Sequence, residues 1–132
     1  LAGGDSIRAR AEAHRWSAFF TSDLHASFWP IFVPFRYTTD DSEAALRAVV
    51  EAGHELVAKK FGILEHHLEG RDYILDGGRS VIDAYAFPMI RWGINLLPHG
   101  LKEYPNVKAL HDKLDADTAV KKVLAREAGA SS

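Results

Sequence analysis

Apolar residues recur every three or four positions in the first part of the chain, which is the spacing of one face of an α-helix. One stripe is bulky and apolar and consists of Trp16, Phe19, Phe20, Leu24 and Phe28. Pro30 and Pro34 follow, and each pushes the residue before it away from helical angles. The pattern therefore predicts a long first helix from Ile7 to about Phe28, which these prolines bend or end.

A second long helix is predicted from Glu43 to Leu68, because apolar residues keep helical spacing over this stretch. Gly53 lies inside it, where a glycine lowers helix stability by about 1 kcal/mol relative to alanine. Close packing against the first helix would compensate for this loss. We therefore expect the two helices to lie against each other near Gly53.

A third helix is predicted to begin after Ser80, where the sequence reads Ser80-Val81-Ile82-Asp83. A serine followed three residues later by an acidic residue, just before an apolar run, is typical of a capping box. The Ser80 hydroxyl can accept a hydrogen bond from the backbone N–H of Asp83, and the Asp83 carboxylate can accept one from the N–H of Ser80. Because this carboxylate is committed to backbone donors, we interpret Asp83 as structural and not as a general acid.

The third helix runs to about Leu97 and is apolar on nearly every side, so we expect other elements to surround it. Residues 72–78 lead into it in extended form, with three apolar anchors, Tyr73, Ile74 and Leu75. Two shorter helices follow, one with Pro105 in its first turn and one with Asp117 as its candidate cap. The last helix is predicted to turn Val120, Val123 and Leu124 inward.

No strand alternation and no internal repeat interrupts this pattern. Residues 1–132 therefore predict a single all-α domain. We expect a bundle of about five helices, in which two long antiparallel helices pack around a buried central helix. The 47% hydrophobic content of the 132 residues is enough for one compact core.

The charge and the cysteine content exclude several classes of function. A formal net charge of -2 and a pI near 6.4 provide no basic surface for nucleic acid and no polybasic patch for a membrane. The absence of cysteine excludes disulfides, zinc–thiolate sites and a cysteine nucleophile within this chain. No apolar run approaches the roughly 18 to 20 residues of a membrane span, so we expect a soluble, cytoplasmic protein.

The seven histidines suggest a metal site, but their spacing argues against one. His66 and His67 are adjacent and would point about 100 degrees apart on a helix. His14 and His25 share a helix face but would lie about 16 Å apart. We therefore expect no dedicated metal site.

The first helix also carries a second stripe, made of small and polar residues: Ala11, Arg15, Ala18, Ser22, His25 and Trp29. Small residues allow another surface to approach closely. This stripe therefore predicts a ligand cleft or a contact with a partner subunit. An ordinary solvated face with incidental alanines is the alternative interpretation.

Three motifs occur in the order typical of one protein family. They are Asp23-Leu24-His25 followed by Phe28 and Pro30-Ile31-Phe32, then Ser80-x-x-Asp83-Ala84-Tyr85 followed by Arg91-Trp92, and finally Tyr104-Pro105-Asn106-Val107. Together they resemble the C-terminal helical domain of cytosolic glutathione transferases, most closely the bacterial beta-type members. The resemblance covers about residues 7–127. It departs at Ala18, where related sequences often have asparagine, and at Asp117-Thr118, where they often have Arg-Pro.

The resemblance implies glutathione conjugation or thiol exchange in a longer protein. Glutathione, a co-substrate and not a cofactor, would be bound as its thiolate by a thioredoxin-like N-terminal domain and would attack a small hydrophobic electrophile. That domain is absent from this chain, so we expect the chain alone to be inactive. It would supply the hydrophobic substrate subsite and the contacts of a homodimer. A non-catalytic binding or assembly module of the same fold is the alternative.

The resemblance also implies roles for individual residues. His25 would line the glutathione cleft, where it could donate a hydrogen bond to glutathione or tune a nearby thiol, although a solvated histidine remains the alternative. Ser22 and Trp29, on the same stripe, are further candidates. Arg91 and Trp92 could wall the cleft, but a buried aromatic ring beside a solvated arginine would explain them equally well.

Overall fold

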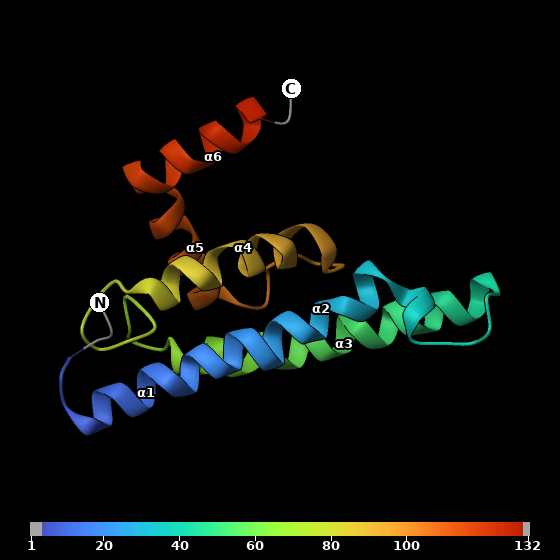
Figure 1. The fold of residues 1–132 in the computed structure, drawn as a ribbon, viewed down its shortest axis with the longest axis horizontal. Helices are drawn as coiled ribbons and strands as arrows, with labels where there is room; N and C mark the ends of the chain where they lie inside the picture. Colours follow the sequence, from blue (N-terminus) through green and yellow to red (C-terminus); the bar gives the residue numbers. More distant parts are fainter. Residues whose placement is uncertain (1–3, 131–132) are drawn as a thin grey trace.

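The computed structural model describes residues 4–130 and shows a bundle of helices joined by loops (Figure 1). In chain order the elements are α1 (Ile7–Ala18), the π-helical turn η1 (Phe19–Leu24), α2 (His25–Phe32), the 3-10 turn η2 (Pro34–Arg36), α3 (Glu43–His67), α4 (Val81–Leu96), α5 (Pro105–Asp115) and α6 (Thr118–Ala130). Because α1, η1 and α2 are continuous, residues 4–130 form five helical rods and contain no strand. The predicted all-α bundle of about five helices is confirmed.

The first rod is longer than the sequence pattern predicts. The helix continues through Pro30 to Phe32, past the bound expected near Phe28, and ends just before Pro34, one of the two prolines that were expected to bend or end it. Pro30 is buried where α2 meets α3, and a Cβ atom added to Gly53 would lie only 3.2 Å from the Pro30 Cβ. Packing between the helices therefore keeps the proline inside the rod, even though its nitrogen cannot donate a backbone hydrogen bond.

The helix α3 runs antiparallel to the first rod, and its bounds agree with the prediction (Figure 1). Ser42 caps its start, because the Ser42 side chain accepts a hydrogen bond from the backbone N–H of Ala45. A Cβ atom on Gly53 would lie 2.8 Å from Ile31 Cγ1, which is closer than such atoms approach in real proteins. The expected close contact between the two long helices at Gly53 is therefore confirmed.

Ser80 and Asp83 form a capping box at the start of α4. The backbone N–H of Ser80 donates to Asp83 Oδ2 at 2.7 Å, and the Ser80 hydroxyl donates to the same oxygen at 3.0 Å. The Ser80 Oγ also accepts from the backbone N–H of Ile82 at 3.2 Å. The other carboxylate oxygen, Oδ1, accepts from the backbone N–H of Ile74 at 3.0 Å. Asp83 is fully buried, so this one carboxylate joins α4 to the loop that precedes it.

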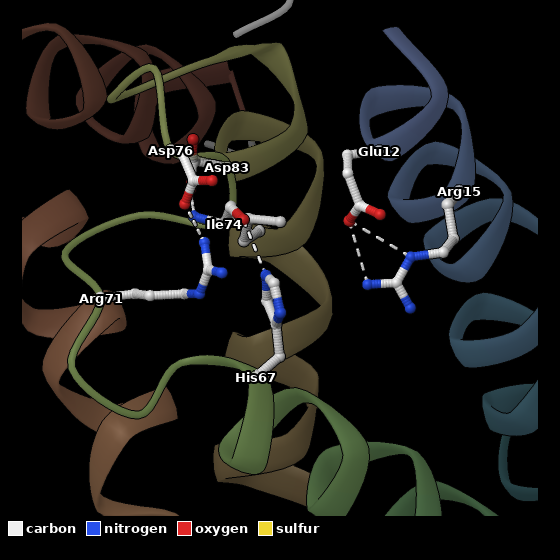
Figure 2. Close-up of polar contacts among 7 residues, drawn as sticks. All are labelled: Glu12, Arg15, His67, Arg71, Ile74, Asp76 and Asp83. Carbon is white, nitrogen blue, oxygen red and sulfur yellow. Dashed lines mark hydrogen bonds and ion pairs between the residues drawn. The ribbon is translucent and has the colours of Figure 1, made fainter. Parts of the chain in front are cut away.

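The segment between α3 and α4 is a series of bends and turns, and it is not extended as predicted. Contacts between side chains and backbone groups, and not regular backbone pairing, hold this segment in position, as Figure 2 shows. The Nε2 of His67, at the end of α3, donates to the carbonyl of Ile74 at 2.7 Å, and Arg71 pairs with Asp76. Ile74 is fully buried and Leu75 nearly so, which makes these residues the apolar anchors of the segment.

Burial lowers the pKa of the His67 imidazole, and the neighbouring Arg71 and Arg15 lower it further. The hydrogen bond to Ile74 and the charge of Glu12 oppose this shift but are outweighed. Figure 2 shows the ring between the Arg71–Asp76 pair on one side and the Glu12–Arg15 pair on the other. The folded protein therefore favours the neutral ring.

We expect the stability of the protein to fall as the pH drops below about 6.5, the ordinary pKa of imidazole. The unfolded chain then binds a proton at His67 more readily than the folded protein does, and this difference favours unfolding. Urea denaturation at pH values on either side of 6.5 measures the change. In His67→Gln, which keeps a side-chain donor for Ile74, the decline should be shallower. An identical decline in both proteins would contradict this role for His67.

The central helix α4 is enclosed on one side only. Its buried residues are Ile82, Asp83, Ala86, Phe87, Met89, Ile90 and Gly93. The opposite face is exposed and carries Val81, Ala84, Tyr85, Pro88, Arg91 and Ile94. The expectation of a helix surrounded on nearly every side therefore holds for the core face and fails for this second face, which no other element of residues 4–130 fully covers.

The last two helices differ in how firmly they are attached. The carboxylate of Glu65 on α3 accepts the backbone N–H groups of Asn106 and Val107, both at 2.9 Å, and so caps α5 from outside. In contrast, α6 contains no buried residue and projects away from the other helices (Figure 1). Val120 and Leu124 are partly buried and pack against the core as predicted, whereas Val123 is 54% exposed, so the prediction that it also faces inward is wrong.

Candidate functional site

Aromatic side chains from the first rod and from α4 meet around His25. The His25 ring stacks on Trp29, with ring centroids 5.9 Å apart and planes 16° apart, and its centroid lies 5.4 Å from that of Trp92. Phe32 packs edge-on against Trp92 at 5.2 Å. The Tyr85 hydroxyl lies 3.4 Å from His25 Nδ1. We call these five residues, His25, Trp29, Phe32, Tyr85 and Trp92, the aromatic wall.

Helix periodicity explains how residues distant in the sequence reach this wall. Trp29 follows His25 by four positions on α2, so both side chains lie on one face. Tyr85 and Trp92 are seven positions apart on α4, which is about two helical turns, and they also share a face. Phe28, fully buried beneath them, contacts Trp92 edge-on at 5.4 Å and connects the wall to the core.

The wall is open to solvent. Trp29, Phe32 and Tyr85 are each 40% exposed, while His25 and Trp92 are half-buried. Adjacent large aromatic side chains that remain exposed typically mark a binding surface. Their flat faces can stack on an apolar, planar ligand, and the histidine and tyrosine add hydrogen-bonding groups beside it.

The structure brings together three of the five residues that the sequence nominates for the cleft: His25, Trp29 and Trp92. Ser22 lies in the π-helical turn, is exposed, and has Thr21 as its hydrogen-bonding neighbour at 3.5 Å. Arg91 packs over the ring of Phe87 at 5.8 Å and so lies apart from the wall. Although Arg91 and Trp92 are adjacent in the sequence, successive helix residues point about 100 degrees apart, so the two side chains lie on different faces of α4.

Sequence reasoning missed Tyr85 and Phe32 as members of the wall. The signal for Tyr85 was available, because it precedes Trp92 by two helical turns and therefore shares its face. Phe32 could not be placed, because the helix was expected to end before it. Phe32 is found only once the course of α2 past Pro30 is known.

A separate groove of about 570 Å³ lies between α4, the end of α5 and α6. Its lining is mostly apolar: Val81, Ala84, Phe87, Pro88, Leu114, Ala119, Val120, Val123 and Leu124. Arg79, Arg91 and other polar residues complete it, and Arg79, in the loop before α4, pairs with Asp117, directly before α6. The exposed face of α4 and the open side of α6 thus form two walls of one groove.

Within residues 4–130, no three histidine, aspartate or glutamate side chains gather closely enough to hold a metal ion. A smaller pocket of about 200 Å³ contains His54 and His99 beside Glu55 and Glu103, without forming such a group. None of the helices in this part of the chain has the length and apolar character needed to cross a membrane.

The fold and the wall define a helical domain with an exposed aromatic surface. The model of the family described as "Glutathione S-transferase, C-terminal domain" matches residues 22–127. The chain therefore belongs to the glutathione S-transferase family and corresponds to its C-terminal domain. The family that the three sequence motifs resemble is confirmed.

Individual relatives agree with this assignment. Glutathione S-transferase GST-4.5 of Xanthomonas campestris pv. campestris is 34% identical over 96 residues, which are 70% of this chain and 44% of that protein. The structure of a glutathione S-transferase from Xylella fastidiosa matches 97% of this chain and 61% of its own, with a TM-score of 0.86 and 27% identity. A bacterial beta-class enzyme from Sphingomonas chungbukensis matches 96% and 58%, with a TM-score of 0.78 and 25% identity. The chain thus spans less than two thirds of the length of each.

Proposed function

We propose that this chain is the helical part of a glutathione transferase and forms one side of the site where glutathione is conjugated to an electrophile. The observation that carries the proposal is the aromatic wall, in which His25 meets Trp29 and Trp92 in a chain of this family. The stacked, exposed rings suit a planar, hydrophobic electrophile. Glutathione is the co-substrate, and no cofactor is needed for this role.

In this proposal the residues of the wall have different roles. Trp29, Phe32 and Trp92 offer apolar surface to the electrophile, and His25 offers a hydrogen bond to glutathione. Ser22, exposed on the first rod, remains a candidate for a polar contact with glutathione. Arg91 would act from the groove, where it can contact a neighbouring part of the protein instead of the electrophile.

We further propose that the groove between α4 and α6 receives the thioredoxin-like domain that would precede this chain. The relatives above are much longer than the region that this chain matches, and the additional part is the occupant that we propose for the groove. The apolar lining suits a permanent contact within one protein, and Arg91 lies where the two parts would join. We expect the complete protein to be a cytoplasmic homodimer whose thiol-activating residue lies outside this chain.

His25→Ala in the full-length enzyme is expected to lower kcat/KM by roughly tenfold or more, since a hydrogen bond to a charged ligand contributes about 1.5 to 3 kcal/mol. Conjugation of glutathione to chlorodinitrobenzene measures the effect, and a thermal melt checks the fold. His14→Ala is the matched control, because His14 is an exposed histidine on the same rod. A lower melting temperature with unchanged kinetics would make His25 a structural residue and contradict the proposal. A full-length protein without any conjugating activity would favour the assembly module instead.

A further inference from the structure

We propose that Tyr85 is a positioning residue for His25: its hydroxyl donates to His25 Nδ1 and keeps the imidazole proton on Nε2. The contact joins α4 to the first rod, between residues 60 positions apart in the sequence, with 3.4 Å between the two atoms. The consequence for catalysis rests on the proposed function above, but the pairing itself does not.

Contacts of neighbouring residues anchor both partners. Tyr85 follows Asp83 by two residues, in the first turns of a helix whose start is anchored by the buried capping box. His25 begins α2, directly after the π-helical turn, and its ring stacks on Trp29 and contacts Trp92. These contacts restrict the rotation of the imidazole ring, so the side of the ring that carries Nδ1 stays turned toward Tyr85.

The chemistry of a neutral imidazole then decides which nitrogen carries the proton. One ring nitrogen is a donor and the other an acceptor, and the hydrogen bond made by one sets the role of the other. A phenolic hydroxyl that donates to Nδ1 makes this nitrogen the acceptor and leaves the N–H at Nε2. Histidines in functional sites are commonly oriented in this way by a neighbouring group.

This arrangement determines what His25 can offer a ligand. With its proton on Nε2, the ring presents a donor on the side away from Tyr85. The donor suits an acceptor such as a thiolate sulfur or a carboxylate, both of which glutathione carries. The opposite tautomer would present a bare nitrogen there and could not donate. Tyr85 would thus act on the bound ligand through His25, without touching it.

Nitrogen-15 NMR of labelled histidine in the full-length protein tests the pairing directly, at an alkaline pH where imidazole groups are neutral. The His25 signals, assigned by their loss in His25→Gln, are expected to show the proton on Nε2. In Tyr85→Phe they should shift toward a mixture of both tautomers, whereas the control Tyr37→Phe should leave them unchanged. A proton on Nδ1 in the unmodified protein, or signals unaffected by Tyr85→Phe, would overturn the proposal.

Kinetics provide the second test. Tyr85→Phe is expected to lower kcat/KM by about threefold to tenfold, as for the loss of one uncharged hydrogen bond. The same substitution should have no further effect in a His25→Ala background, because Tyr85 acts only through that ring. An equal loss in both backgrounds would overturn the positioning role. If His25→Ala leaves kcat/KM unchanged, the proposed function fails, while the NMR result still decides whether Tyr85 sets the tautomer.

Discussion

Asp83→Ala is expected to lower the free energy of unfolding by about 3 to 5 kcal/mol. The fully buried carboxylate accepts three hydrogen bonds, from the backbone N–H groups of Ile74 and Ser80 and from the Ser80 hydroxyl. Alanine leaves both backbone donors buried without a partner, and each such donor costs about 1 to 3 kcal/mol. The lost helix cap adds about 1 kcal/mol.

Chemical denaturation of the purified chain measures this change. Asp76→Ala is the matched control, because the Asp76 side chain is 87% exposed and pairs with Arg71 at the surface. We expect its effect to stay within about 0.5 kcal/mol. Asp83→Asn should fall between the two, since an amide keeps one acceptor oxygen but cannot serve both Ile74 and Ser80. A loss below 1 kcal/mol in Asp83→Ala would show that the box does not organise the fold.

Gly93→Ala is expected to destabilise the protein by about 2 kcal/mol, although alanine normally favours a helix. The added Cβ atom would lie 2.2 Å from Cε2 and 2.5 Å from Cζ of Phe61. Phe61 is fully buried, with Phe28 on one side and Tyr104 on another, so its ring cannot move aside without disturbing the core. The expected loss of packing therefore exceeds the gain in helix propensity.

Gly62→Ala, on the neighbouring helix α3, is the control, because we expect it to change the stability in the opposite direction. A Cβ atom on Gly62 would meet nothing within 4 Å, and the residue is exposed within α3. We expect this substitution to stabilise the protein by about 0.5 to 1 kcal/mol. In Gly93→Ala, a second substitution Phe61→Leu should recover part of the loss by making room. Equal effects of the two glycine substitutions would rule out the contact with Phe61 as their cause.

Local signals in the sequence were enough to locate the long helices. Ser42 and Ser80 cap α3 and α4 through bonds to residues only two or three positions away, so a pattern of neighbouring residues predicts where each helix begins. The course of the first rod depends on distant residues instead. Whether the helix continues at Pro30 depends on its packing against Gly53, which no local pattern contains.

In the candidate site, too, local spacing predicts some of the contacts and not others. His25 and Trp29 could be paired from their spacing on one helix, and the resemblance to a family added Trp92 from another. The contact between Tyr85 and His25 depends on how α4 lies across the first rod, which spacing along the chain cannot specify. Arg91 was nominated together with Trp92 from one motif, yet adjacent helix residues face different surroundings.

The uneven attachment of α6 gives the domain two levels of stability. The buried residues of α3 and α4 are expected to exchange their backbone amide hydrogens only when the core opens. The helix α6 has no fully buried residue, since only Val120 and Leu124 pack partly against the core, and its first turn is held by the Asp117 carboxylate, which also pairs with Arg79. It can therefore unwind and re-form while the remaining helices stay folded. Its amides would gain further protection from hydrogen exchange when another surface covers its apolar side.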